Sequence, residues 1–438
     1  MKVAISGVRG IYGLDLTLHE ISRLTRLFAS SLIKRADSCV LASDTRPSSR
    51  LIGQFVAANL MGAGIHVYNL GIAPTPLVFR ESRKYAAGIV ITASHNPLEW
   101  NGLKFIINGR GIFEEELNFM LKNQLRLDYG KFGKFFEIQS NYVDEVVDLT
   151  AKRQAKTNTR VGLDPGGGAA CGYSNRLLEQ LGYTFYSIND IPGLSSRNPD
   201  PTTDDLSELS ALVSSNNLDF GFAFDLDGDR LVIINEKGEK LNADSTLLLC
   251  VANAISMGMK KFVSSVDTSL SVEKYISERG CSLSYSKVGE ANVVKKMLDV
   301  GADAGGEGSS AGFIIPKFNM CRDAFLASSI ISSLEKNVVE ECLDLSSKYL
   351  QIRSAVFVDS ALHTKVIDKL MDILNAEASE ILNLDGVKAI LDNDSWILVR
   401  PSNTEDAMRI SVESTRQRAQ LLFKKTSERV QSVYDQVK

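Results

Sequence analysis

The sequence predicts an α/β protein: three similar mixed α/β domains, followed by a smaller C-terminal α+β domain. Two observations predict this fold class. The chain has 438 residues, enough for about three domains, give or take one. It also shows one pattern three times: a short apolar strand ending in Asp, a helix closed by Gly, and a second strand. We expect domains at 1–140, 141–240, 241–348 and 349–438.

The three copies are βαβ units in which Gly ends the helix. In order, their first strands are residues 39–44, 161–164 and 262–267, and their helices end near Leu60, Leu181 and Arg279. Each copy continues into another apolar strand that leads into a polar loop, at residues 93–97, 225–230 and 306–310. Open α/β sheets bind ligands at the carboxyl ends of their strands, so we expect one functional loop in each domain.

The chain after about Ile352 has a different pattern and offers a fourth loop. Residues 396–399 and 408–412 read as strands around a polar turn at 400–406. Residues 417–437 read as an amphipathic helix with Leu421, Leu422, Val430 and Val433 among its apolar positions.

The composition excludes several classes of protein. Hydrophobic residues make up 44% and charged residues 23%, which is typical of globular chains. The net charge of −4 lacks the excess of positive charge of a nucleic-acid binder. The chain has no apolar run of about 20 residues and no secretory signal at its start. The charge and the lack of a long apolar run lead us to expect no nucleic-acid or membrane partner. The six cysteines form no Cys-x-x-Cys pair, so we expect a cytoplasmic protein without disulfides or zinc.

The acidic loop after the second domain's strand predicts a metal site. Asp225, Asp227 and Asp229 alternate directly behind five apolar residues. An extended backbone would send all three carboxylates to one side, and a hard cation such as Mg²⁺ would relieve their repulsion. The alternative is a solvated turn.

The first domain's loop presents Ser94, followed by His95 and a Pro that stops the helix or strand. An ordinary turn explains this pattern equally well. A serine hydrolase does not, because no Gly-x-Ser-x-Gly surrounds Ser94. Lys104 could reach the same site as a cation or proton carrier, although an isolated lysine usually lies on the surface.

The third and fourth loops have the groups that bind a phosphosugar. Glu307, Ser309 and Ser310 could hydrogen-bond sugar hydroxyls. The fourth loop holds two guanidiniums with hydroxyl and amide groups, the ingredients of a phosphate cradle. Its residues are Arg400, Ser402, Asn403, Thr404 and Arg409. A charged hairpin turn is the alternative for this loop. No Gly-x-x-x-x-Gly-Lys-[Ser/Thr] motif is present, so ATP is not the expected phosphoryl donor.

With these residues in family order, the chain resembles the α-D-phosphohexomutase superfamily, and its archaeal-type members most. Residues 92–97 resemble the phosphoserine loop, 225–230 the metal loop, 306–309 the sugar-binding loop and 400–405 the phosphate-binding loop. Arg9 and Arg46 also match family positions near the phosphoserine. The chain departs from bacterial members at Glu290, where they have His, and from the usual phosphate loop at Asn403 and Asp406.

The resemblance implies four domains around a central cleft and a mutase that interconverts hexose 1-phosphate and hexose 6-phosphate. Phosphorylated Ser94, with Mg²⁺ held by Ser94, Asp225, Asp227 and Asp229, would form a hexose 1,6-bisphosphate intermediate, which also serves as activator. The resemblance further implies catalytic roles for Arg9, His95, Lys104 and Arg230. All four are candidate cations that would offset the negative charge of the acids and the phosphoserine. Lys104 is also the candidate general acid or base. Glucose, mannose or glucosamine phosphate is the expected substrate, and a homodimer is an expected assembly.

Two other functions fit part of the sequence. A haloacid-dehalogenase-like phosphatase also has an apolar strand followed by Asp-x-Asp-Gly, with the first Asp as nucleophile. A catalytically weakened phosphosugar-binding paralogue would explain Asn403 and Asp406.

Overall fold

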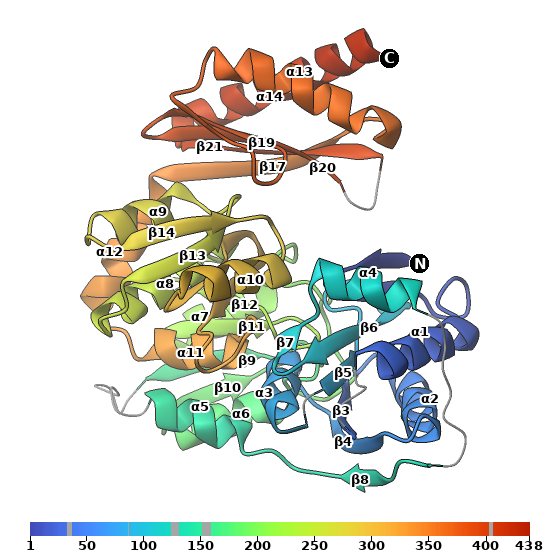
Figure 1. Ribbon diagram of the computed structural model, residues 1–438. Coiled ribbons are helices and arrows are strands. Elements are labelled where there is room, and N and C mark those ends of the chain that lie inside the picture. The colour runs from blue at the N-terminus through green and yellow to red at the C-terminus, as the bar shows by residue number, and fades with distance from the viewer. Residues whose placement is uncertain (33–36, 86, 124–130, 151–158, 403–405) are drawn as a thin grey trace.

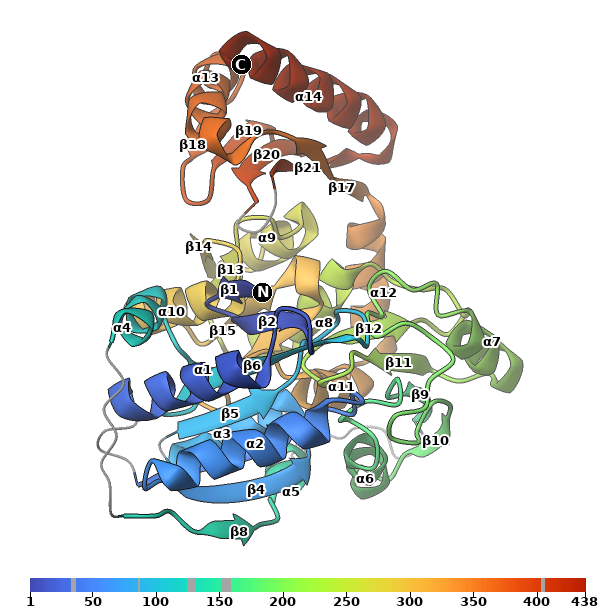
Figure 2. The same cartoon turned by 90° about the vertical axis from the view of Figure 1, so that its right-hand side faces the viewer.

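The fold is built on four sheets, seen in a computed structural model that describes residues 1–32, 37–85, 87–123, 131–150, 159–402 and 406–438. Domains I to IV denote the parts of the chain built on the first to the fourth sheet. Figure 1 shows domains I, II and III packed side by side and domain IV above domain III. Figure 2 shows the same arrangement from the side.

Domain I contains an eight-stranded mixed sheet in the order β1-β2-β6-β5-β3-β4-β8, with β7 paired to β6. The predicted βαβ unit is β3-α2-β4, and its parallel partner β5 ends at the Ser94 loop. The elements are β1 (Lys2–Ala4), β2 (Gly7–Ile11), α1 (Leu18–Ser31), β3 (Ser38–Ser43), α2 (Ser49–Gly62), β4 (His66–Ile72), α3 (Thr75–Tyr85), β5 (Ala87–Ile91), β6 (Trp100–Ile107), β7 (Arg110–Gly111), α4 (Glu114–Lys122) and β8 (Phe135–Glu137).

Domains II and III repeat one sheet plan. Their strand orders are β10-β9-β11-β12 and β14-β13-β15-β16, parallel except for the last strand of each. The elements of domain II are α5 (Tyr142–Thr150), β9 (Arg160–Asp164), α6 (Tyr173–Gln180), β10 (Thr184–Ser187), α7 (Ser207–Asn216), β11 (Phe220–Phe224) and β12 (Leu231–Ile234). Those of domain III are α8 (Ala243–Ser256), β13 (Lys261–Ser265), α9 (Leu270–Ser277), β14 (Ser282–Ser286), α10 (Glu290–Val300), β15 (Ala304–Glu307), the 3₁₀ turn η2 (Gly308–Ser310), β16 (Gly312–Ile314), α11 (Ala324–Ser332) and α12 (Lys336–Ser347).

Domain IV is an antiparallel sheet in the order β17-β21-β20-β19-β18, covered on one face by two helices. The predicted C-terminal helix is present, with Val430 and Val433 buried, but Leu421 is 57% exposed and does not belong to the buried face. The elements are β17 (Tyr349–Phe357), η3 (Ser360–Leu362), α13 (His363–Asn375), β18 (Glu380–Leu382), β19 (Val387–Asp392), β20 (Ser395–Pro401), β21 (Ala407–Thr415) and α14 (Arg416–Val437).

The largest hydrophobic cluster joins domains I to III, which also have smaller clusters of their own, whereas domain IV has a separate core. Val78 of domain I, Phe224 of domain II and Phe325 of domain III belong to a single buried cluster. Val387 and Val430 belong to a separate cluster within domain IV. The first three domains are therefore tied together more extensively than the fourth. Within the described ranges, no helix combines the length and apolarity that crossing a bilayer requires.

Candidate active site

Ser94 lies in a strained loop at the carboxyl end of β5. It is fully buried, and its φ of 54° is unusual for a residue other than glycine. The Ser94 N–H donates to Thr92 Oγ1 at 2.7 Å. A backbone in this region costs about 1–3 kcal/mol and persists where surrounding contacts hold it, which is typical of functional loops.

Arg46 holds the backbone of the Ser94 loop in place. Its guanidinium donates to the carbonyl oxygens of Ser94, Asn96, Pro97 and Trp100, and Asp44 pairs with its Nε at 2.9 Å. Both charged side chains are fully buried. The arginine and the strand-ending Asp noted in the sequence therefore fix the backbone that presents the serine.

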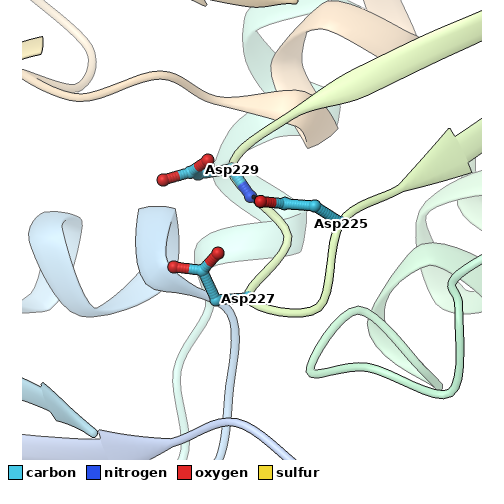
Figure 3. Close-up of side chains that lie close together, drawn as sticks. All are labelled: Asp225, Asp227 and Asp229. Carbon is cyan, nitrogen blue, oxygen red and sulfur yellow. Dashed lines mark hydrogen bonds between the residues drawn. The ribbon is translucent and has the colours of Figure 1, made fainter. Parts of the chain in front are cut away.

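The metal loop brings Asp225, Asp227 and Asp229 together, with one oxygen from each lying within 4.8 Å of the others. Figure 3 shows the three side chains leaving a single turn between β11 and β12. The expected extended backbone is wrong, because β11 ends at Phe224 and the loop turns at Gly228 with φ of +71°. Asp225 Oδ1 closes this turn by accepting the N–H groups of Asp229 and Arg230.

The Ser94 hydroxyl faces the first of these acids. Ser94 Oγ lies 3.2 Å from Asp225 Oδ2 and 3.3 Å from His95 Nδ1. Two loops that are far apart in the sequence therefore form one site between domains I and II.

Lys104 on β6 neutralises part of the acidic cluster. Its Nζ donates to Asp227 Oδ2 at 2.7 Å and to Asp229 Oδ2 at 2.8 Å. Burial alone would lower the pKa of Lys104, but Asp227 and Asp229 raise it above its ordinary value. Lys104 is thus a buried cation of the site and not a surface lysine.

Arg9 and Arg230 form a positive wall beside His95. Arg230 is buried and Arg9 partly buried, and neither Nε atom has a hydrogen-bond partner, although Arg230 Nε lies 3.8 Å from Asp225 Oδ2. Burial, together with Arg230 and Arg9, lowers the pKa of His95 to about 2. In the unphosphorylated site this lowered pKa favours the neutral imidazole of His95. Guanidinium Nε atoms that are buried and have no hydrogen bond suit an anion such as a phosphoryl group.

The acids also fit a divalent cation. Asp227 Oδ1 and Asp229 Oδ1 are buried and have no hydrogen-bond partner, although buried polar atoms usually have one. Burial raises the pKa of Asp225 well above its ordinary value, and Asp227 and Asp229 raise it further. Burial acts in the same direction on Asp229, but Arg322 and Lys104 outweigh it and lower that pKa. Carboxylate oxygens are the ligands that Mg²⁺ prefers.

The sugar-binding loop of domain III reaches the acidic cluster through an arginine that sequence reasoning missed. Arg322 pairs with Glu307 at 3.1 Å, with Asp229 at 3.0 Å and with Glu290 at 3.3 Å. Glu307 is buried at the end of β15, and Ser309 is partly exposed in η2. Arg322 precedes α11 and carries no motif, so only its place at the start of a helix in an α/β domain could have indicated it.

Thr75 is the second residue that sequence reasoning missed. It begins α3, and its hydroxyl donates to Asp227 Oδ2 at 2.7 Å while its N–H donates to the Asp227 carbonyl at 2.8 Å. These two bonds fix the middle acid from domain I.

The fourth loop places two arginines opposite each other. Arg400 on β20 pairs in register with Arg409 on β21, on the sheet face that also carries Trp396 and Leu398. Two guanidiniums facing each other in this way suit an anion such as a phosphate. Asn403 and Thr404 lie outside the described residues, and the Ser402 N–H donates to the Ala407 carbonyl.

Asp406, one of the two departures from the usual phosphate loop, bonds residues outside that loop. Its carboxylate accepts the Ser360 N–H at 3.2 Å, and hydrogen bonding by Ser360 lowers its pKa. Its carbonyl accepts the N–H of Val358. Asp406 therefore joins the phosphate-binding loop to the segment that follows β17.

The chain has three α/β domains and one α+β domain. A serine hydroxyl, an acidic cluster and buried cations lie where domains I, II and III meet. This arrangement is typical of multidomain phosphotransferases. Models of the phosphoglucomutase/phosphomannomutase family match the chain throughout: α/β/α domain I at residues 1–126, domain II at 140–238, domain III at 242–349 and the C-terminal domain at 362–425. The chain belongs to this family, and it is a phosphohexomutase of the isomerase class.

Relatives agree with this assignment, and a solved structure shares the fold. A "Probable phosphoglucosamine mutase" of Pyrococcus horikoshii is 31% identical, covering 98% of this chain and 97% of the relative. A phosphoglucosamine/phosphogalactosamine mutase of Sulfurisphaera tokodaii is 29% identical, covering 93% and 94%. The fold matches a phosphoglucomutase/phosphomannomutase family protein of Burkholderia thailandensis with a TM-score of 0.86 and 22% identity, covering 98% of this chain and 96% of that one.

Proposed function

We propose that this phosphohexomutase interconverts hexose 1-phosphate and hexose 6-phosphate through phosphorylated Ser94, with glucosamine phosphate as its main substrate. The observation that carries the proposal is the position of the Ser94 hydroxyl. It lies 3.2 Å from Asp225 Oδ2 in a site that also holds the Nε atoms of Arg9 and Arg230, neither of which has a hydrogen-bond partner.

Phosphoryl transfer depends on positioning and on neutralising charge. Mg²⁺, when bound by Asp225, Asp227 and Asp229 with the phosphorylated Ser94, would supply a Lewis acid for the phosphoryl oxygens. Arg9 and Arg230 offer charged donors to the same oxygens. Lys104 holds two of the acids and can exchange a proton with the reacting hydroxyls.

The reaction exchanges one phosphate ester for another. The free hydroxyl of the hexose phosphate attacks the phosphorus on Ser94, the bond from phosphorus to Ser94 Oγ breaks, and the hydroxyl proton passes to the released serine oxygen. The resulting hexose 1,6-bisphosphate turns over in the cleft and returns its other phosphoryl group to Ser94. The same bisphosphate, added from outside, would activate unphosphorylated enzyme.

The rest of the substrate would lie between domains III and IV. Glu307 and Ser309 would bind the sugar hydroxyls. Arg400 and Arg409, with Ser402, Asn403 and Thr404, would hold the phosphate that is not reacting.

Two observations favour an amino sugar. Relatives of similar length bear the names of phosphoglucosamine mutases. Beside the sugar-binding loop, Arg322 pairs with the buried carboxylate of Glu307 and with the partly exposed carboxylate of Glu290, and an ammonium group on the sugar would add a second cation beside these two acids.

The proposal is tested by mass spectrometry and a coupled assay. Purified wild-type protein should carry one phosphoryl group, and Ser94→Ala should lose both this mass and turnover. Ser38→Ala, a part-buried serine of the same domain that bonds the Tyr85 carbonyl, serves as control. With Mg²⁺ and bisphosphate, glucosamine phosphate should turn over faster than glucose or mannose phosphate.

Other outcomes point to the alternatives. A Ser94→Ala variant that keeps its phosphoryl group and its turnover would exclude the serine and favour a phosphorylated aspartate. A protein that turns over none of the three sugars would be a binding paralogue. The homodimer and the cytoplasmic location stay predictions.

A further inference from the structure

Asp385 lies in the turn between β18 and β19 of domain IV and contacts two other loops. Its Oδ2 accepts the N–H of Val288 in domain III at 3.2 Å. The same oxygen lies 3.9 Å from Nη1 of Arg400, one of the two arginines of the phosphate-binding loop. A single carboxylate therefore connects this loop to domain III.

The turn that carries Asp385 is fixed against β20. Gly386 has φ of +76°, and a Cβ on it would lie 2.2 Å from the Val399 carbonyl oxygen and 2.6 Å from Arg400 Cα. The absence of a side chain lets the turn press on the backbone of Arg400. This packing places the Asp385 carboxylate beside the Arg400 guanidinium.

The loop that Asp385 contacts leads to the centre of the site. The next residue, Gly289, donates its N–H to Glu307 Oε1 at 2.6 Å. Glu307 pairs with Arg322, which pairs with Asp229 of the metal loop. A continuous chain of polar contacts thus joins Arg400 of domain IV to the acidic cluster of domain II.

The contact at Asp385 lies at the partly exposed edge of the junction between domains III and IV, as do the ion pairs Lys274–Asp394 and Arg353–Asp244. The centre of the junction is buried: Trp396 packs with Val266 and Leu270, and Lys388 Nζ donates to the Val266 carbonyl at 2.8 Å. The side chains of Asp385 and Arg400, by contrast, are 19% and 22% exposed. Partly hydrated groups exchange partners at low cost, so this contact can open while the buried junction stays packed.

We propose that Asp385 is a positioning residue of the mutase: it latches domain IV to the 287–289 loop of domain III and aims Arg400 at the phosphate that is not reacting. The proposal rests on the proposed function, because it concerns the bisphosphate intermediate. That intermediate must turn round without leaving, and a domain IV that is not latched would let it escape. Replacing Asp385 should therefore increase the loss of bisphosphate during turnover.

The test compares Asp385→Asn and Asp385→Ala with the wild type. The asparagine keeps an oxygen for the Val288 N–H but has no charge for Arg400, and the alanine loses both. Glu377→Gln is the control, since it removes a charged partner of Arg429 within the same domain. Thermal unfolding first establishes that every variant is folded.

Three measurements are made on the full-length protein. In Asp385→Ala, the concentration of added glucosamine 1,6-bisphosphate that gives half-maximal activity should rise about tenfold, the change expected from losing one charged contact. Free bisphosphate should accumulate during turnover. Deuterium exchange of the peptide containing Val288 should become faster, and Asp385→Asn should lie between alanine and wild type in the activity measurements.

The outcomes separate the two proposals. If the wild type turns over and Asp385→Ala shows the same bisphosphate requirement and the same exchange, the latch is excluded. Equal effects in Glu377→Gln would also exclude it. If the wild type does not turn over, the proposed function fails, and unchanged exchange at Val288 would still overturn the latch independently.

Discussion

Arg322 shows how a single residue organises this site. It is buried against Asp229, Glu290 and Glu307, and it belongs to neither the metal loop nor the sugar-binding loop. Gly312 makes room for it, because a Cβ there would lie 2.2 Å from Arg322 Cδ. Burial would lower the pKa of Arg322, but the surrounding acids hold it well above its ordinary value. One cation thus offsets acids from two domains.

We expect Arg322→Met to be strongly destabilising. The substitution leaves three carboxylates without their shared cation, and breaking a buried ion pair from one side typically costs about 3–5 kcal/mol. Denaturant unfolding measures this change in the free energy of unfolding. Arg429→Met removes a more exposed ion pair with Glu377 and should cost less than about 1 kcal/mol. Equal losses in the two variants would contradict the role of Arg322.

At the scale of elements, the amino end of α9 meets the sheet of domain IV. Glu413 on β21 accepts the Ser269 hydroxyl, the Leu270 N–H at 2.7 Å and the Trp396 indole N–H at 2.9 Å. Burial raises the pKa of Glu413 to about 7, and Asp244 contributes, although hydrogen bonds from Ser269 and Leu270 oppose the shift. An acid of domain IV therefore caps a helix of domain III.

The raised pKa of Glu413 predicts that the stability of the protein depends on pH. Because the folded pKa is raised, the stability that protonated Glu413 contributes is fully present below its ordinary pKa of 4.5 and is lost as the pH rises through about 7. The shift corresponds to about 3 kcal/mol at most. Glu413→Gln mimics the protonated acid, since Ser269 can reverse its hydrogen bond. The melting temperature of this variant, relative to wild type, should increase between about pH 5 and pH 8.

The control for this prediction is Glu377→Gln, whose carboxylate is about half exposed in the same domain. Its melting temperature should follow that of the wild type across the same range. A constant difference between Glu413→Gln and wild type at every pH would show that Glu413 does not titrate in this range.

At the scale of the whole molecule, three domains share a core and the fourth is attached through a smaller junction. The cluster that joins domains III and IV contains Val266, Leu270, Tyr349, Trp396 and Leu398, far fewer residues than the core shared by domains I to III. The serine, the acids and Arg322 all lie in the shared body, whereas Arg400 and Arg409 lie in domain IV. Movement at the junction would therefore shift these two arginines, which we propose hold the phosphate, without disturbing the acidic cluster.

Removal of divalent cations should accordingly separate activity from folding. Treatment with a chelator should abolish turnover, because it removes the cation that we propose Asp227 Oδ1 and Asp229 Oδ1 bind. The melting temperature should fall by less than about 4 °C, because Lys104 and Arg322 still neutralise part of the cluster. Turnover and thermal unfolding before and after returning Mg²⁺ measure both effects. A collapse of the melting temperature would show instead that the fold depends on the metal.

Local pattern was enough to predict much of the fold. The three βαβ units appear as β3-α2-β4, β9-α6-β10 and β13-α9-β14, since alternating apolar runs, strand-ending Asp and helix-ending Gly act within a few neighbouring residues. The same local chemistry singled out Ser94 and the three acids. The domain boundaries expected at residues 140, 240 and 348 stay predictions.

Only the tertiary structure decided which of these groups meet. Arg322 and Thr75 carry no motif, yet packing brings them to Asp229 and Asp227, and Asp385 reaches Val288 across a domain boundary. The lowered pKa of His95 likewise depends on burial and on arginines distant in sequence. Motifs record the chemistry of short segments, whereas charge balance in a buried site is a sum over every domain that surrounds it. The sequence by itself therefore determined the reactive groups, and the packing of the domains decided their partners.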